Sequence, residues 1–128
     1  MTHVAGPFDV KLAPQDDKID PTLGRLTIDK QYHGDLSGTG KGQMLTATTG
    51  VKESAVYVAV ERVSGTLAGR TGSFALYHNG IMERGTPHLS INVVPDSGTG
   101  QLTGITGKMD IKIADGKHTY DFEYSLPQ

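Results

Sequence analysis

A ten-residue pattern of glycines around one leucine occurs twice in this chain and restricts the folds open to it. Residues 65–74 read GTLAGRTGSF, and residues 100–109 read GQLTGITGKM. Both fit G-x-L-x-G-x-x-G followed by a large apolar residue, and a looser version occupies residues 34–44. Such spacing disfavours helices, whereas glycine permits the kinks and bulges that bend a sheet. The repeat therefore predicts the corners of a curved β-sheet; the lining of a ligand cavity is a secondary explanation.

The segments between these glycines alternate apolar and polar residues, which is typical of half-buried strands. The alternation is clearest at residues 26–36 and 118–126. Helical periodicity is absent, and turn-forming pairs recur at short intervals, of which Asp115-Gly116 is the strongest hairpin signal. We predict an all-β fold in which about eight antiparallel strands close into a single barrel over residues 1–128. A barrel of that size can be filled by side chains or can hold one small ligand.

Turn-forming residues also predict several strand boundaries. Pro14 is expected to end a first strand at residues 8–12, and the glycines of residues 38–42 are expected to turn the chain. Asn79-Gly80 could be a hairpin turn or a bulge in a longer strand. We favour the bulge, because residues 84–87 offer a better turn just beyond it.

Composition excludes several classes of function. The net charge is −2, and no cluster of lysines and arginines suggests a nucleic-acid surface. Without cysteine the chain has no disulfide, no thiol nucleophile and no cysteine metal site. No histidine pair has metal-ligand spacing on one strand, so we predict neither a metal nor another cofactor. No leader peptide or apolar membrane span is visible, which predicts a cytoplasmic protein without a membrane partner.

The segment at residues 55–63 (AVYVAVERV) is apolar on both faces. Such a strand is normally covered on both sides. In a barrel the core covers one side, and a second subunit, a terminal segment or a loop must cover the other. We therefore predict a homo-oligomer that forms through the face of residues 55–63.

Strand alternation also directs several polar residues into the barrel. Counting in steps of two from Leu67 places Glu61 and Tyr57 inward, and counting from Phe74 places His78 inward. The same counting directs Lys30 inward, where it could pair with Glu61. The predicted ligand-binding residues are Lys30, Tyr32, Tyr57, Glu61, His78 and Tyr120. The catalytic candidates are Glu61 and His78, because an enclosed carboxylate and an imidazole could move a proton on a bound molecule.

These inward polar residues have three interpretations, in descending order of preference. They form a structural hydrogen-bond network, they contact a ligand, or they catalyse a reaction. Three functions are considered for the protein. The preferred one is a barrel that binds a small, apolar molecule, and the alternatives are a cofactor-free isomerase or cyclase that uses Glu61 and His78 and an assembly protein without a ligand. A bulge that reversed the strand alternation would instead expose some of these groups.

Three strings at residues 24–36, 57–67 and 94–100 resemble the bacterial domain of unknown function 3224 family. The resemblance covers nearly the whole chain. It implies a fold similar to the allene oxide cyclase-like barrels, which are relatives of the calycins and often form oligomers. It implies no established activity. Plant allene oxide cyclases bind a lipid epoxide inside the barrel, but fold alone is weak evidence of function, and no pocket residue is carried over from them.

Overall fold

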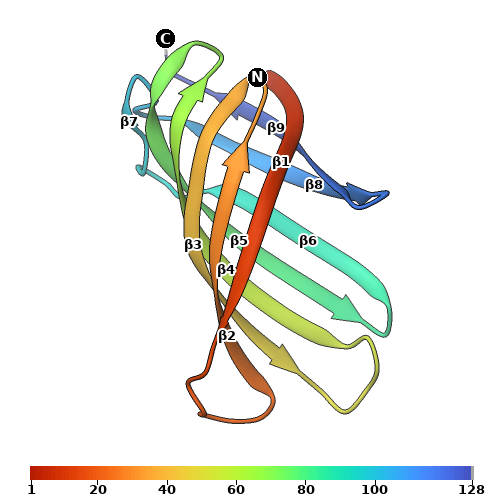
Figure 1. Cartoon of the computed structure of the whole chain (residues 1–128). Helices are drawn as coiled ribbons and strands as arrows, with labels where there is room; N and C mark the ends of the chain where they lie inside the picture. The colour runs from red at the N-terminus through yellow and green to blue at the C-terminus, as the bar shows by residue number, and fades with distance from the viewer. Residues whose placement is uncertain (128) are drawn as a thin grey trace.

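The computed structural model of the chain describes residues 1–127, which contain nine strands and no helix (Figure 1). The strands are β1 (Thr2–Gln15), β2 (Leu23–Tyr32), β3 (Leu36–Thr48), β4 (Ala55–Leu67), β5 (Arg70–Glu83), β6 (Thr86–Val93), β7 (Thr99–Gly100), β8 (Thr106–Ala114) and β9 (Lys117–Ser125). No helix long and apolar enough to cross a membrane occurs among these residues.

Eight of the strands form one closed antiparallel sheet. Their order is β4-β3-β2-β1-β9-β8-β6-β5, and β5 pairs again with β4 to complete the ring. The ninth strand, β7, adds two residues alongside the start of β5. The predicted all-β fold with a closed barrel of about eight strands is confirmed, with one short strand in addition.

Both copies of the glycine repeat place a tight turn directly after a buried leucine. Leu67 and Leu102 are both buried in the core, as the predicted corner function requires. The first copy turns β4 into β5 through Ala68 and Gly69, which have φ angles of 48° and 86°. In the second copy Gly104 has a φ of 83° in the turn between β7 and β8. Positive φ angles suit glycine, so the repeat marks turns between strands.

Two predicted boundaries are wrong. β1 continues through Pro14 to Gln15. Beyond Phe8 it pairs only with β2, and a strand with one free edge tolerates proline. Residues 38–42 lie within β3, and the chain turns earlier, at Gly34, which has a φ of 96°. These strand positions are occupied by glycine because neighbouring groups fill the space that a side chain would need.

Asn79-Gly80 is neither a turn nor a bulge. β5 passes through both residues, and its register with β4 and β6 stays constant across them. Gly80 lies opposite Tyr57, whose ring occupies the place of a Cβ on that glycine. The hairpin turn lies at Arg84 and Gly85, where φ is 46° and 89°, as expected from residues 84–87.

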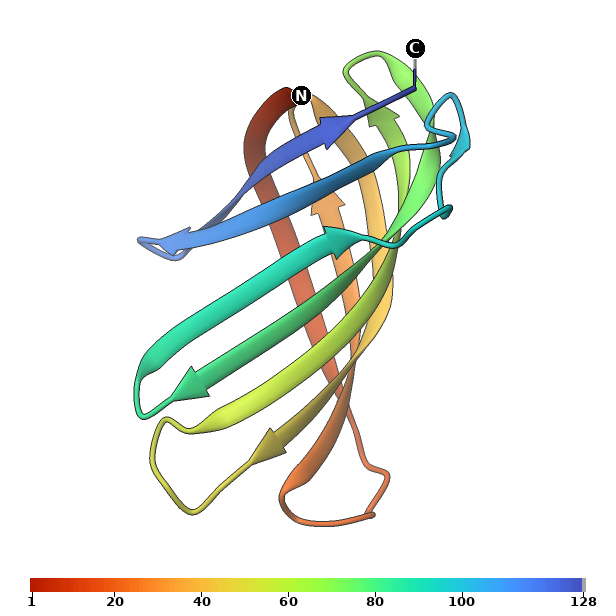
Figure 2. The ribbon, with the colours of Figure 1, turned by 180° about the vertical axis from the view of Figure 1, so that it is seen from behind.

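The barrel is packed at one end and open at the other. At the packed end aromatic rings of β5 and β9 stack, with 5.6 Å between the ring centroids of Phe74 and Phe122. β6 and β8 pair through only two residue pairs, Ile91 with Met109 and Asn92 with Lys108, and these lie next to the packed interior. The β5–β6 and β8–β9 hairpins therefore diverge toward the other end, as the rear view shows (Figure 2). This divergence leaves part of the inner face of the sheet accessible.

Replacing Gly65 by alanine tests the close approach of β3 and β4. A Cβ on Gly65 would overlap the backbone of Ser37 and Gly38 on the opposite strand. We expect Gly65→Ala to lower the free energy of unfolding by about 1–3 kcal/mol, measured by urea denaturation. Gly50→Ala is the matched control, because nothing lies within 4 Å of a Cβ there. Equal stability of the two variants would contradict this account.

Candidate functional site

A buried carboxylate, that of Glu61 on β4, is the centre of a polar network inside the barrel. Its Oε1 accepts hydrogen bonds from Lys30 Nζ and from His78 Nε2, each at 2.7 Å. Its Oε2 accepts a hydrogen bond of 2.9 Å from the Tyr32 hydroxyl. Lys30 Nζ also lies 3.4 Å from the Tyr32 hydroxyl oxygen. The Glu61 side chain is 0% exposed, so protein groups replace the water that a carboxylate normally binds.

Two glycines of β3 make this network possible. β3 lies between β2, which carries Lys30, and β4, which carries Glu61. In the sheet register Gly40 lies opposite Lys30, and Gly42 lies opposite Glu61. A Cβ on Gly40 would overlap Glu61 Oε2 and touch the Tyr32 ring. The missing side chains therefore leave a gap through which groups from β2 and β4 meet across β3.

The network keeps Glu61 ionised. Burial by itself raises the pKa of a carboxyl group. The hydrogen bond from His78 and the charge of Lys30 outweigh that burial and lower the pKa of Glu61 from its ordinary 4.5 to about 2. Burial, followed by the nearby Glu61 charge, raises the pKa of Tyr32 well above its ordinary value. At neutral pH the site thus combines a carboxylate that only accepts hydrogen bonds and a phenol that donates one.

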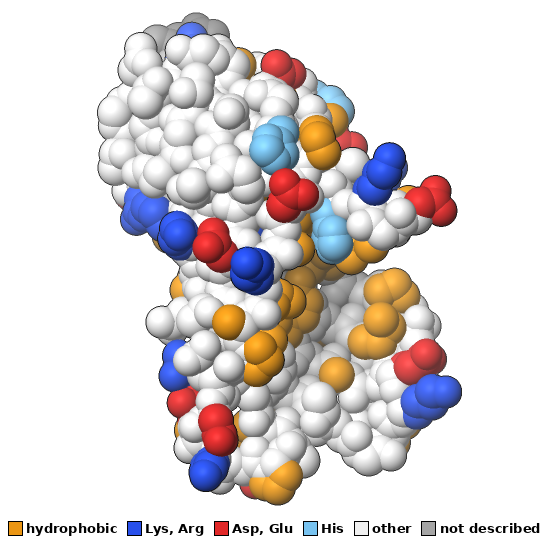
Figure 3. All heavy atoms as spheres, viewed as in Figure 1, with side chains coloured by type: hydrophobic (Ala, Val, Ile, Leu, Met, Phe, Trp, Pro, Cys, Tyr) orange, Lys and Arg blue, Asp and Glu red, His pale blue; other side chains and the backbone are white. Residues whose placement is uncertain are grey.

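Apolar residues surround the open half of the barrel beyond this network. The register places Leu12, Met82, Leu89 and Ile113 on the inner face of the sheet. They are nevertheless 44%, 39%, 41% and 68% exposed. In the space-filling view the molecule is hollowed between the diverging hairpins, and hydrophobic side chains line the hollow (Figure 3). We call this the inner groove.

The polar network lies where packed interior gives way to the inner groove. Ile91, opposite His78, is 2% exposed, whereas Leu89, the next inward residue of β6, belongs to the groove wall. On β1 the half-buried Val10 lies opposite Lys30, and the exposed Leu12 is the next inward residue. The groove therefore has apolar walls and a polar inner end.

Four of the six predicted site residues form one hydrogen-bond network, and Tyr57 and Tyr120 lie outside it. Lys30, Tyr32, Glu61 and His78 join in one network. Tyr57 is half-buried two inward positions beyond Glu61 on β4, with Ala59 between them. Burial, followed by the charge of Glu61, raises the pKa of its phenol.

Tyr120 lies apart from the hydrogen bonds of the network. Its hydroxyl donates to the carbonyl of His33 at 2.7 Å and accepts from the amide of Leu36 at 3.0 Å. These bonds hold the turn between β2 and β3. Tyr120 meets the network only through its ring, whose centroid lies 5.7 Å from that of Tyr32.

Counting along strands missed two inner residues beside the network. The Phe8 ring centroid lies 5.2 Å from Lys30 Nζ, close enough for a cation–π contact. His118 of β9 packs against Phe8, with 5.4 Å between the two ring centroids. Strand alternation was the available signal, because Phe8 shares a face with Val10 and His118 shares one with Tyr120.

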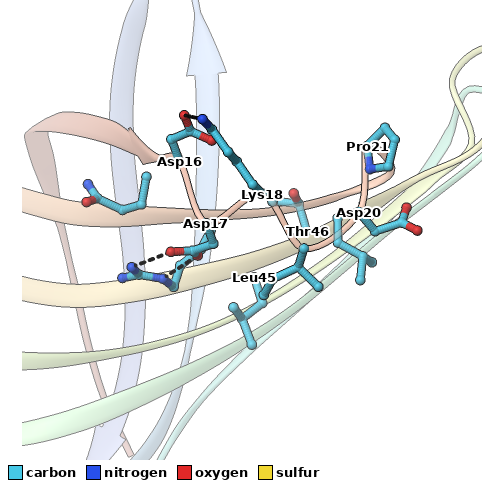
Figure 4. A pocket seen from close by; sticks show the side chains of 12 residues that line it. Asp16, Asp17, Lys18, Asp20, Pro21, Leu45 and Thr46 are labelled. Carbon is cyan, nitrogen blue, oxygen red and sulfur yellow. Dashed lines mark hydrogen bonds and ion pairs between the residues drawn. The ribbon is translucent and has the colours of Figure 1, made fainter.

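A second depression, of about 650 Å³, lies outside the barrel at the loop between β1 and β2 (Figure 4). Its charged groups pair within the loop region, as when Arg25 donates two hydrogen bonds to Asp17, at 2.8 and 3.0 Å. Asp20 likewise accepts from Thr22. Over residues 1–127 no group of three or more histidine or acidic side chains is placed to hold a metal ion. We therefore take the inner groove as the candidate site.

Residues 4–124 match the model of a family described as a protein of unknown function, DUF3224. The chain belongs to this family. A DUF3224 protein of unknown function from Shewanella oneidensis MR-1 has a crystal structure similar to this one, with a TM-score of 0.95 and 47% sequence identity. The match covers 100% of this chain and 98% of that chain. The search of curated proteins found no match. Neither the family description nor the similar structure names an activity, so the case for a function rests on the site.

The lowered pKa of Glu61 predicts how stability depends on pH. A carboxyl group whose pKa is lower in the folded state stabilises the fold above its unfolded pKa and loses that contribution as the pH falls. We expect Glu61 to contribute on the order of 3 kcal/mol that disappears between about pH 5 and pH 2. Urea denaturation across this range should show that the free energy of unfolding falls less steeply with decreasing pH in Glu61→Gln than in the unchanged protein. The exposed Glu83→Gln is the control; an unchanged pH slope in Glu61→Gln would refute the assignment.

Proposed function

We propose that the protein binds a small, largely apolar molecule in the inner groove, with the Glu61 network at the inner end of the site. The observation that carries the proposal is the exposure of residues on the inner face of the sheet, such as Leu89 and Ile113. Ligand sites in proteins are typically concave, mostly apolar and equipped with a few fixed polar groups. The groove has this composition, and the proposed binding requires no cofactor.

The energetics of the groove support a ligand. Removing apolar surface from water is favourable by roughly 25 cal/mol for each Å². Four large side chains on the inner face leave much of their surface in water, although the same strand positions nearer the packed end are buried. An apolar ligand would cover that surface without a rearrangement of the sheet.

Binding can be tested with N-phenyl-1-naphthylamine, a neutral apolar dye that fluoresces when it leaves water. We expect saturable binding of one dye per chain, measured by fluorescence titration. Leu89→Asp should weaken it at least about tenfold, because the variant places a charge in the groove wall. Ile19→Asp is the control, since Ile19 is exposed at the loop depression outside the barrel. No saturable binding, or equal weakening in both variants, would refute the proposal.

A second candidate function is a cofactor-free isomerase or cyclase in which Glu61 and His78 move a proton. The observation that favours it is the 2.7 Å hydrogen bond between Glu61 Oε1 and His78 Nε2 on the inner face of the sheet. A carboxylate that orients an imidazole is a common arrangement for general acid–base catalysis. Cyclohexanone in deuterated water is a suitable probe. Faster deuterium exchange beside its carbonyl, lost in His78→Gln, would support catalysis, and no acceleration would leave binding as the function.

We also propose that a second copy of the chain covers the outer face of β3–β5. Val56, Val58 and Val60 point outward there and are 41–57% exposed. Their outward neighbours across the sheet include Tyr77 and Ile81, also exposed. None of these residues is charged, so two copies of the same face can meet without like-charge repulsion.

If a second copy covers the outer face of β3–β5, the protein forms oligomers whose fraction rises with protein concentration. Analytical ultracentrifugation should find dimers or larger assemblies of the unchanged protein, and monomers of Val58→Glu, because two glutamates would meet in the interface. Ile113→Glu is the matched control, since Ile113 is exposed on the inner face of the sheet. A monomer at high protein concentration would refute the proposal.

A further inference from the structure

We propose that the polar end of the ligand is a neutral hydroxyl group, as in a phenol or an alcohol, and that His78 Nδ1 accepts its hydrogen bond. This inference rests on the proposed binding of an apolar molecule in the inner groove and names the chemistry of that molecule. It assigns the recognition atom to His78 and gives Glu61 the role of a positioning residue.

The first step concerns the tautomer of His78. Its Nε2 lies 2.7 Å from Glu61 Oε1. The lowered pKa of Glu61 means that this carboxylate has no proton to donate, so Nε2 must be the donor. A neutral imidazole carries one N–H, so the lone pair lies on Nδ1. In the neutral ring, which the proposal requires, Glu61 therefore makes Nδ1 a hydrogen-bond acceptor.

The second step concerns access to Nδ1. Within residues 1–127, Nδ1 of His78 has no hydrogen-bond partner. Every fully buried side-chain nitrogen and oxygen atom of these residues does have a partner. Nδ1 must therefore retain contact with solvent, although the His78 side chain is only 4% exposed. His78 lies on the inner face, one inward position from Gly80 and the Tyr57 ring that covers it. Nδ1 is thus an acceptor on a residue whose inward neighbour on β5 is covered by an aromatic ring.

The third step concerns the other polar groups of the network, which are already occupied. Both Glu61 oxygens accept from protein donors. The Tyr32 hydroxyl donates to Glu61 and lies beside Lys30 Nζ. Lys30 Nζ also lies over the rings of Phe8 and Tyr32, 5.2 and 5.6 Å from their centroids. The hydrogen-bond acceptor of the network that remains for a ligand is the lone pair of His78.

An accepting lone pair beside a buried carboxylate selects among ligand classes. A hydroxyl group can donate to it, an ether cannot, and a carboxylate would bring a negative charge toward Glu61. The site should therefore prefer neutral donors to anions of the same shape. Phenols suit the Tyr57 ring best, because aromatic rings stack favourably.

Three probes with one apolar body test this inference: 4-butylphenol, its methyl ether 4-butylanisole, and 4-butylbenzoate. Their affinities can be measured by nuclear magnetic resonance titration at neutral pH. We expect the phenol to bind roughly three- to tenfold more tightly than the ether, which is the usual value of one hydrogen bond, and the benzoate to bind most weakly. His78→Gln should remove the advantage of the phenol. His88→Gln should keep it, because His88 is exposed on the outer face.

The outcomes separate this inference from the proposed function. Equal affinity for phenol and ether, or tightest binding of the benzoate, would overturn the hydroxyl assignment while apolar binding stands. No binding of any probe would overturn both. If His78→Gln does not fold, the nitrogen-15 spectrum of the unchanged protein decides. An unprotonated Nδ1 that shifts with the phenol but not with the ether supports the assignment, and a protonated Nδ1 in the free protein overturns it.

Discussion

The buried charge of Glu61 is the constraint on which the rest of the barrel interior depends. A carboxylate without water is strongly destabilising unless protein groups replace its solvation. Here three donors do so, from Lys30 and Tyr32 on β2 and His78 on β5. The bonds from Lys30 and Tyr32 join β2 to β4, which are not neighbours in the sheet, and the bond from His78 joins β4 to its neighbour β5. The bonds between β2 and β4 also require β3 to carry no side chain at the crossing, which explains Gly40.

The Glu61 network also divides the interior into two parts with different properties. On one side the barrel is filled by stacked aromatic rings and aliphatic side chains, which stabilise the fold. On the other side the β5–β6 and β8–β9 hairpins separate, and inner residues such as Leu89 remain in contact with water. A hollow with apolar walls and a polar inner end results, and it combines burial energy for a ligand with a group that can select one.

The two proposed surfaces use opposite faces of the same strand. β4 directs Glu61 and Tyr57 into the barrel and Val58 and Val60 out of it, because successive side chains of a strand alternate. A second copy on the outer face would cover these valines and leave the inner groove open. Ligand binding and assembly are therefore compatible in one DUF3224 barrel, and substitutions on alternate residues of β4 can separate them.

Strand alternation is a local property, so the sequence alone determined that Lys30, Glu61 and His78 face inward and that Arg84-Gly85 and Asp115-Gly116 turn the chain. Which strands lie side by side depends on residues far apart in the sequence, so only the tertiary structure decided the features that follow from strand pairing. The glycines at residues 38–42 resemble a turn until β2 and β4 lie beside them, and Gly80 resembles a bulge until the Tyr57 ring covers it. The Tyr120 hydroxyl bonds backbone that is more than 80 residues away in sequence, and strand alternation could not predict that contact. The short pairing of β6 with β8, which opens the groove, depends on strands that no local pattern places together.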